Sequence, residues 1–265
     1  MPFKRRYHKT PRPKTLGLSR TGVAHPWRSR IHGALMKRNH ANPPTRIQVP
    51  VSIPLDAEVR LPPSGNPKEV LILLHGFAES GARILGKLEA GFPTQLVEQT
   101  VIWAPNAPFP AAHKKDDGYS LTFSWYFYDP AADEYFIDME PAIEFIQRGL
   151  EKMGWSDLPK RVVGFSQGGY LGLVLCGHLR NVRQFVGVGC DFLVDEFPAR
   201  LPEAAPDRVD GVHGAQDDIV SPAQSRASHA RLLQAGVEGK FELIEGSGHR
   251  IDERIRDAVG RALGR

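Results

Sequence analysis

The sequence predicts an α/β fold: a single domain in which helices cover both faces of a mostly parallel central sheet. Short apolar runs of about five to seven residues alternate along the chain with amphipathic stretches. The runs are rich in Val, Ile and Leu, as strands buried on both faces are, and they are far shorter than the roughly 18 apolar residues that span a membrane. Strands that alternate with helices in this way form parallel sheets.

Six apolar runs are expected to be buried strands, and one further segment alternates between apolar and polar residues as an edge strand does. The buried strands are Glu69–His75, Thr100–Ala104, Arg161–Phe165, Gln184–Gly189, Arg208–His213 and Lys240–Ile244. The edge strand is expected over Arg46–Ile53. Helices are expected near residues 82–90, 137–153, 168–180, 222–235 and 250–263.

The net charge of +4 combines two parts of opposite sign. Residues 1–55 contain twelve Lys or Arg and no acidic residue, whereas residues 56–265 contain 22 basic and 30 acidic residues, a net charge of −8. Prolines at positions 11, 13, 26, 43 and 44 interrupt any helix there, and a chain of this composition buries too little apolar surface to offset its ordering entropy. We therefore expect a mostly disordered extension over residues 1–45 and one domain over residues 46–265.

The basic extension has several possible meanings. Its charge alone would allow it to bind nucleic acid, and a solvated tail without a function is the simpler alternative. No apolar segment follows Arg5-Arg6, as an export signal requires, and the prolines break the helix of a transit peptide. A translation start at Met36 would remove most of the extension. Because the chain has only two cysteines, a reducing, cytoplasmic location is expected.

The segment Gly164–Gly168 (GFSQG) matches the pattern G-x-S-x-G. In such a nucleophile elbow the serine occupies a strained turn between a strand and a helix, and the flanking glycines let the two backbones approach each other. An expected buried strand precedes Ser166 and an apolar stretch follows it, which is the context that the motif requires. The alternative is that Ser166 only caps the helix.

A nucleophilic serine needs a histidine as its base, and in this arrangement the histidine follows the serine in the chain. His249 ends the glycine-rich segment EGSGH, directly after an expected strand. Catalytic groups of open α/β sheets lie at the carboxyl ends of strands, so His249 is the preferred base. His178 follows the serine on its own helix, and His229 is expected on an exposed helix surface. A histidine in a surface loop is the alternative interpretation of His249.

The orienting acid is also expected after a strand. Asp217 and Asp218 follow Arg208–His213, and Asp217 is preferred, with Asp218 expected to be solvated or to cap the next helix. Asp191 is a rival, since it follows another expected strand. His213 is expected to support the loop.

An oxyanion hole is expected after the first buried strand, where His75-Gly76 would let the next backbone N–H point at a developing negative charge. The donors would be the N–H groups of Phe77 and of Gln167, the residue after the serine. An ordinary glycine turn is the alternative.

Six segments occur in a fixed order: LLHGFAESG, WAPNAPFP, SWY, GFSQGG, HGAQDDIV and GSGH. Through them, residues 68–263 resemble the phospholipase/carboxylesterase family of α/β-hydrolases, which includes acyl-protein thioesterases and small bacterial carboxylesterases. The resemblance implies an α/β-hydrolase fold and a serine esterase that works through an acyl-enzyme. It assigns Ser166 as nucleophile, Asp217 as acid and His249 as base, with the amides of Phe77 and Gln167 as oxyanion hole.

Two segments depart from that pattern. Phe77-Ala78-Glu79 stands where thioesterase members commonly have Leu-Gly-Asp, and Ser124–Asp129 (SWYFYD) stands where Ser-Trp-Phe-Asp is usual. An esterase for short or medium acyl chains is therefore the preferred interpretation. The alternatives are an acyl-protein or lipid thioesterase, a lysophospholipase, and a non-catalytic binding protein of the same fold.

The segment 106–136 contains nine of the 23 aromatic residues of the chain. Phe109, Trp125 and Tyr126 are candidates for the wall of a small-molecule ester or thioester pocket, the alternative being that they pack the segment onto the core. Cys176 and Cys190 are expected to be packing residues. The sequence has no metal-ligand spacing and no nucleotide-binding glycine motif, so no metal and no cofactor is expected.

Overall fold

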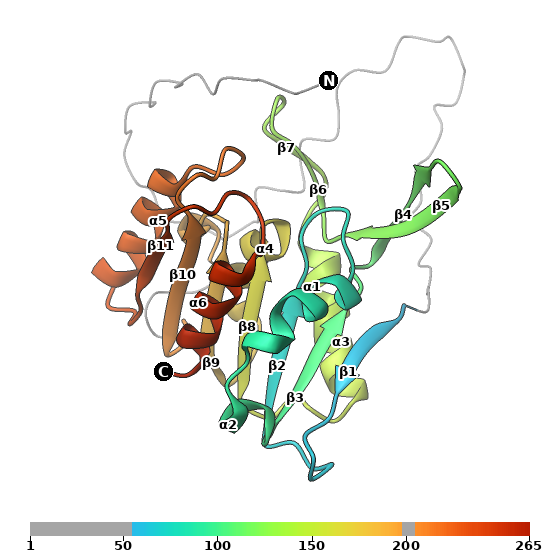
Figure 1. The fold of residues 1–265 in the computed structure, drawn as a ribbon, viewed down its shortest axis with the longest axis vertical. Coiled ribbons are helices and arrows are strands. Elements are labelled where there is room, and N and C mark those ends of the chain that lie inside the picture. Colours follow the sequence, from blue (N-terminus) through green and yellow to red (C-terminus); the bar gives the residue numbers. More distant parts are fainter. Residues whose placement is uncertain (1–54, 198–204) are drawn as a thin grey trace, which may run out of the picture. The chain divides into compact units, whose positions relative to one another are not determined.

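The computed structural model of the chain describes residues 55–197 and 205–265. The expected extension over residues 1–45 and the expected edge strand Arg46–Ile53 lie outside these residues. The described part is built around a seven-stranded sheet with the strand order β1-β3-β2-β8-β9-β10-β11 (Figure 1). The strands are β1 (Ala57–Arg60), β2 (Glu69–Leu74), β3 (Thr100–Pro105), β8 (Lys160–Phe165), β9 (Val182–Val188), β10 (Arg208–Gly214) and β11 (Phe241–Ile244).

All neighbouring strands of this sheet run parallel except β1, which pairs antiparallel with β3 at one edge. The six expected buried strands are all present, with ends within two residues of those expected. The crossovers between parallel strands carry the helices α1 (Gly81–Leu88), α2 (Thr94–Val97), α3 (Glu140–Lys152), α4 (Gln167–Cys176) and α5 (Pro222–Gln234), and α6 (Glu253–Leu263) follows the last strand.

Two hydrophobic clusters fill the two sides of the sheet, as the alternation of side chains along β2 illustrates. Val70, Ile72 and Leu74 point into the cluster that contains residues of α3, α4 and α5. Leu71 and Leu73 point into the other cluster, beneath α1 and α6. All five side chains are completely buried. The expected α/β fold with helices on both faces is therefore confirmed.

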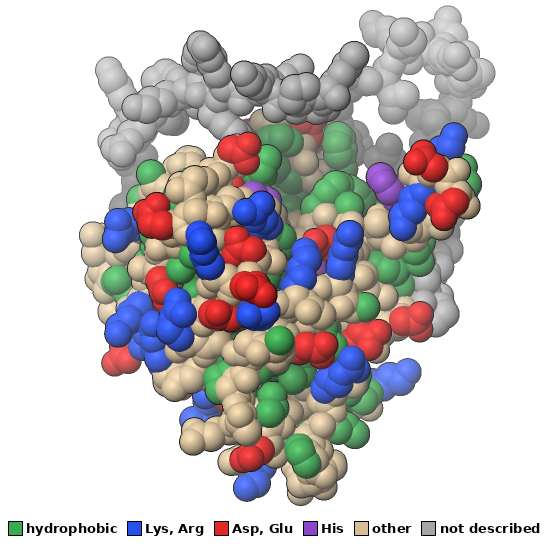
Figure 2. All heavy atoms as spheres, in the orientation of Figure 1, with side chains coloured by type: hydrophobic (Ala, Val, Ile, Leu, Met, Phe, Trp, Pro, Cys, Tyr) green, Lys and Arg blue, Asp and Glu red, His purple; other side chains and the backbone are tan. Residues whose placement is uncertain are grey.

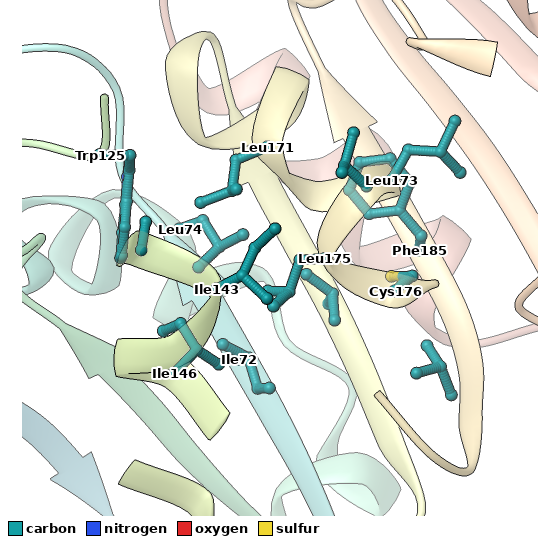
Figure 3. Packing of buried hydrophobic residues seen from close by; sticks show 14 of the residues in the cluster. Ile72, Leu74, Trp125, Ile143, Ile146, Leu171, Leu173, Leu175, Cys176 and Phe185 are labelled. Carbon is teal, nitrogen blue, oxygen red and sulfur yellow. The ribbon is translucent and has the colours of Figure 1, made fainter. Parts of the chain in front are cut away.

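Figure 3 shows the first cluster, in which α3 and α4 pack their aliphatic side chains against β2. α4 is apolar nearly all round, because it lies between the sheet and the rest of this cluster. The surface has a different character. On the face that Figure 2 shows, acidic and basic side chains are interspersed. Among the described residues, none of the helices combines the length and the apolarity needed to cross a bilayer.

Between β3 and α3 the chain forms two hairpins that the strand pattern did not predict. The first pairs β4 (Phe109–Lys115) with β5 (Gly118–Ser124), and the second pairs β6 (Phe127–Asp129) with β7 (Glu134–Ile137). Asp116 and Asp117 form the two-residue turn of the first hairpin, and Gly118 begins β5 with φ 144°. Both hairpins project beyond the carboxyl edge of the sheet (Figure 1).

Candidate active site

Ser166 occupies a sharp turn between β8 and α4, with backbone angles φ 50° and ψ −118°. A positive φ is strained for serine, and such strain is a feature of functional turns. The flanking glycines are required by close contacts. A Cβ atom at Gly164 would lie 2.3 Å from the Gly168 carbonyl oxygen, and one at Gly168 would lie 2.3 Å from the Leu74 oxygen. The turn has the geometry that the sequence motif predicts.

The side chains of Ser166, His249 and Asp217 form a continuous hydrogen-bonded chain. His249 Nε2 lies 2.9 Å from Ser166 Oγ, and His249 Nδ1 lies 2.8 Å from Asp217 Oδ2. Ser166 stands at the N-cap position of α4, but its side chain makes no capping hydrogen bond. The serine hydroxyl is thus directed at the histidine, and the alternative of a simple helix cap does not describe it.

Asp217 is held by four neighbouring groups. Its Oδ1 accepts hydrogen bonds from the N–H groups of Ile219 at 3.0 Å and Val220 at 2.8 Å. Its Oδ2 is shared between His249 and His213, whose Nε2 lies 3.2 Å away. Burial by itself would raise the pKa of this carboxyl, but the hydrogen bonds from His213, His249 and Val220 together lower its pKa below the usual value. A buried, ionised carboxylate is what an orienting acid requires.

The other candidate acids and bases lie elsewhere. Asp218 is exposed, and Ser221 rather than Asp218 caps α5. Asp191 makes no hydrogen bond to His249, and its Oδ1 has no partner among the described residues. His229 is 1 % exposed, which corrects the expectation of an exposed position. His229 lies on the buried side of α5, and its Nε2 donates a hydrogen bond to the Val209 carbonyl oxygen at 2.9 Å.

The loop after β2 is oriented by the buried ring of His75. Its Nε2 accepts a hydrogen bond from the Ala107 N–H at 3.1 Å, so the ring proton is on Nδ1, which lies 2.7 Å from the Gly76 oxygen. The C=O and N–H of a trans peptide point in opposite directions. With the Gly76 carbonyl bound to His75, the N–H of Phe77 in the same peptide unit is turned away from the ring. Burial lowers the pKa of His75 to about 4, which keeps the ring neutral.

Gln167 connects the turn at Ser166 to the chain between the two hairpins. It is the first residue of α4, so its N–H has no carbonyl partner within the helix. Its side-chain oxygen accepts the Trp125 N–H at 2.9 Å, and its side-chain nitrogen donates to the Tyr126 oxygen at 2.8 Å. Trp125 Nε1 in turn donates to the His75 oxygen at 2.8 Å. The sequence analysis did not identify these roles for the side chains of His75 and Gln167.

The three aromatic candidates for the pocket wall take different positions. Trp125 is completely buried in the core, and a side chain without exposed surface does not line an open pocket. Trp125 is therefore a packing residue of the core. Tyr126 is 8 % exposed and contacts Tyr135 edge to face. Phe109 is half-buried, and its ring centroid lies 5.9 Å from that of Phe127.

Both cysteines are buried, and burial raises the pKa of each thiol, as expected of packing residues. Across residues 55–197 and 205–265, no group of three or more His, Cys, Asp or Glu side chains is arranged to hold a metal ion.

Fold and comparisons together define a serine hydrolase of the α/β-hydrolase fold. A family model described as "Serine hydrolase (FSH1)" matches residues 65–238. The chain belongs to this family, and the resemblance inferred from its motifs is confirmed. A comparison with curated protein sequences gave no match.

Solved structures of hydrolases share the fold. Esterase PE8 superposes with a TM-score of 0.59 and 22% identity, covering 80% of this chain and 99% of its own. Acyl-protein thioesterase 2 of Zea mays superposes with a TM-score of 0.56 and 19% identity. The match covers 79% of this chain and 97% of that protein. A phospholipase/carboxylesterase of Dyadobacter fermentans superposes with a TM-score of 0.56 and 15% identity. The match covers 82% of this chain and 100% of that protein.

Proposed function

We propose that this serine hydrolase cleaves carboxylic esters of short or medium acyl chains, with Ser166 as nucleophile, His249 as general base and Asp217 as orienting acid. The observation that supports this most strongly is the chain of two hydrogen bonds through His249, at 2.9 Å to the serine and 2.8 Å to the aspartate. Because Asp217 accepts the proton on Nδ1, the Nε2 lone pair faces the serine hydroxyl.

The reaction then proceeds in two halves. As Ser166 Oγ attacks the acyl carbon, its proton passes to His249 Nε2, and the carbonyl oxygen becomes an oxyanion. Collapse of this intermediate breaks the bond to the alcohol oxygen, which takes the proton from His249 and leaves an acyl-enzyme. A water molecule attacks the acyl-enzyme with the same proton transfers, and the carboxylic acid is released while Ser166 regains its proton.

The backbone N–H groups of Phe77 and Gln167 are the proposed donors to the oxyanion. Gln167 N–H begins a helix, where the peptide dipoles favour negative charge. The peptide containing Phe77 N–H is held by the bond between His75 and the Gly76 oxygen at 2.7 Å. Donors that are fixed before the reaction need no reorganisation when charge develops, which is the main advantage of such a site.

The experiment that tests this function is an acyl-chain series of p-nitrophenyl esters, run beside matched thioesters on the wild type and on Ser166→Ala. Hydrolysis of the esters by the wild type alone would support the proposal. A preference for thioesters at every chain length would move the assignment to a thioesterase, since both reactions use the same acyl-enzyme. Equal rates in the variant would contradict Ser166 as nucleophile.

A further inference from the structure

A cavity of about 640 Å³ lies between the loop that carries Phe77 and the first hairpin. One wall is the segment from Ala78 into the first turn of α1, and the other is formed by β4 and β5. Its volume is within the range of small-ligand pockets. Ala78 follows Phe77 directly, so this groove begins one residue from a proposed oxyanion donor.

Four of the five hairpin residues that line the groove are polar, Leu121 being the exception, and this follows from the register of the hairpin. Directly opposite residues of an antiparallel pair share a face. His113 is opposite Ser120, Ala111 is opposite Thr122 and Lys115 is opposite Gly118, so these residues lie on one face. Of them, His113, Lys115, Ser120 and Thr122 line the groove. The other face carries Tyr119, which is 75% exposed.

The groove is positively charged in a domain that is otherwise negative. Arg83 faces it from α1, and His113 and Lys115 face it from β4. Within residues 55–197 and 205–265, the side chains of these three residues have no ion pair or hydrogen bond. Residues 56–265 have a net charge of −8 with histidine counted as neutral, so the two unpaired cations Arg83 and Lys115 at one groove stand out from the rest of the surface.

The acidic neighbours of the groove do not cancel this charge. Glu79 is the one carboxylate among the residues that line it, and it is bonded to Lys87 Nζ at 2.6 Å and to the Gly76 N–H at 3.3 Å. Asp116 and Asp117 occupy the turn after β4 and do not line the cavity. Figure 2 shows acidic and basic side chains together at the outer end of this hairpin.

The groove is also fixed relative to Ser166. The Phe123 N–H donates to the Glu79 oxygen at 2.9 Å, which joins the base of the hairpin to the loop after β2. The Gly76 N–H also donates a hydrogen bond to Glu79 Oε2, which holds the same loop. A group bound in the groove is therefore placed at a defined position with respect to the serine.

We propose that this groove binds a negatively charged group, a carboxylate or a phosphate, that is part of the ester substrate. The inference rests on the proposed esterase function and adds the class of substrate. An anion between Arg83, His113 and Lys115 would hold the ester so that its carbonyl reaches Ser166. Exposed charge contacts of this kind change an equilibrium by about five-fold each at most, so two of them together change it by up to roughly 25-fold.

The test compares two esters that differ only in charge: p-nitrophenyl pentanoate and the p-nitrophenyl monoester of glutaric acid. The measured quantity is the ratio of their kcat/KM values, charged over neutral. We expect the double variant Arg83→Gln/Lys115→Gln to lower this ratio about ten-fold at low ionic strength. The matched control, Arg148→Gln/Lys152→Gln on α3, removes two cations far from the groove and should leave the ratio unchanged.

Two further measurements make the result specific. Asp116→Asn/Asp117→Asn should raise the ratio, because it removes two negative charges at the turn of the hairpin that forms one wall of the groove. Glutarate and inorganic phosphate, each added as an inhibitor, show which anion the groove prefers. An equal ratio in the wild type and the groove variant would overturn this inference while leaving the esterase function intact. Absence of turnover with both esters would instead overturn the proposed function, and this inference with it.

Discussion

The central sheet and the first hairpin are built in opposite ways. Residues 70–74 of β2, at the centre of the sheet, have no exposed side chain, and the loops at its carboxyl edge carry Ser166, Asp217 and His249. In β4, by contrast, every residue from Pro110 to Lys115 is exposed. The sheet is held in place by packing on both faces. The hairpin is held by the backbone hydrogen bonds between β4 and β5 and by the hydrogen bond from Phe123 to Glu79 at its base.

This difference separates two tasks. Hydrogen-bond lengths near 2.8 Å between catalytic groups require a rigid support, which the sheet supplies through its close-packed interior. Recognition of a substrate group needs charge and access to solvent, which an exposed hairpin supplies. We expect variants at the sheet edge to change the rate of the chemical step, and variants in the hairpin to change which substrate is used.

The largest effect is expected for Ser166→Ala, which should abolish ester hydrolysis. In a serine protease such a change lowers kcat by about 10⁶-fold. A fluorophosphonate probe should label the wild type with one adduct by intact mass and should not label the variant. Labelling that persists in Ser166→Ala would place the nucleophile outside the sheet edge.

Asp217→Asn should lower kcat by up to about 10⁴-fold, because the amide no longer fixes the histidine tautomer or stabilises its cation. Asp218→Asn is the matched control, since this neighbouring carboxylate is exposed. Steady-state kinetics on a neutral ester would compare the two. An equal loss in both variants, or a loss confined to Asp191→Asn, would contradict the choice of acid.

His75→Gln should lower kcat by about 10- to 100-fold with little change in KM, since it misorients one oxyanion donor. His75→Asn places its amide nitrogen where Nδ1 lies, so the bond to the Gly76 oxygen is retained and more activity should remain. Affinity for a boronate transition-state analogue should fall in parallel with kcat. If both variants kept the wild-type kcat at unchanged melting temperature, His75 would have no positioning role.

Gln167→Met tests the connection between the two regions. It leaves the buried Trp125 N–H and Tyr126 carbonyl without partners, at a cost of about 1–3 kcal/mol each. We expect the melting temperature to fall by several degrees in calorimetry. Gln147→Met, which removes a single bond to the His178 oxygen, should have a smaller effect. A melting temperature equal to that of the wild type would show that the hairpins are held by other contacts.

The smallest effect is expected for a chain that begins at Met36. The deleted residues are free of acids and interrupted by prolines, and exposed charge contacts are weak and screened by salt. At physiological ionic strength, kcat/KM on a small ester and the melting temperature should stay within experimental error. Affinity for polyanions should decrease, because nine of the twelve basic residues in residues 1–55 are lost. Loss of activity or solubility would mean that the extension packs on the domain.

The sheet and the position of its catalytic loops could be predicted because their signals are local. Glu69–His75 is a continuous apolar run, and it forms β2 over Glu69–Leu74. Ser166, Asp217 and His249 each follow a strand that the sequence predicts, which places all three at the carboxyl edge of the sheet. Buried strands consist largely of apolar residues, and such runs can be recognised in the sequence.

The hairpins and the roles of two side chains could not be predicted in the same way. β4 has no buried face, so its sequence lacks the apolar alternation that marks a strand. The partners of His75 and Gln167 are backbone groups 32 and 42 residues away in the chain. Such contacts form only when distant segments are brought together by the tertiary fold, so no local sequence pattern predicts them.

The way the first hairpin is attached has an evolutionary consequence. β4 makes extensive contact with β5 alone, and the pair is joined to the domain near Phe123. Insertions and deletions at its tip therefore leave the hydrophobic core undisturbed, and so does any exchange of its exposed residues. Lineages that descend from such a protein are free to diversify in the substrates they accept, while the inherited sheet stays under strict selection.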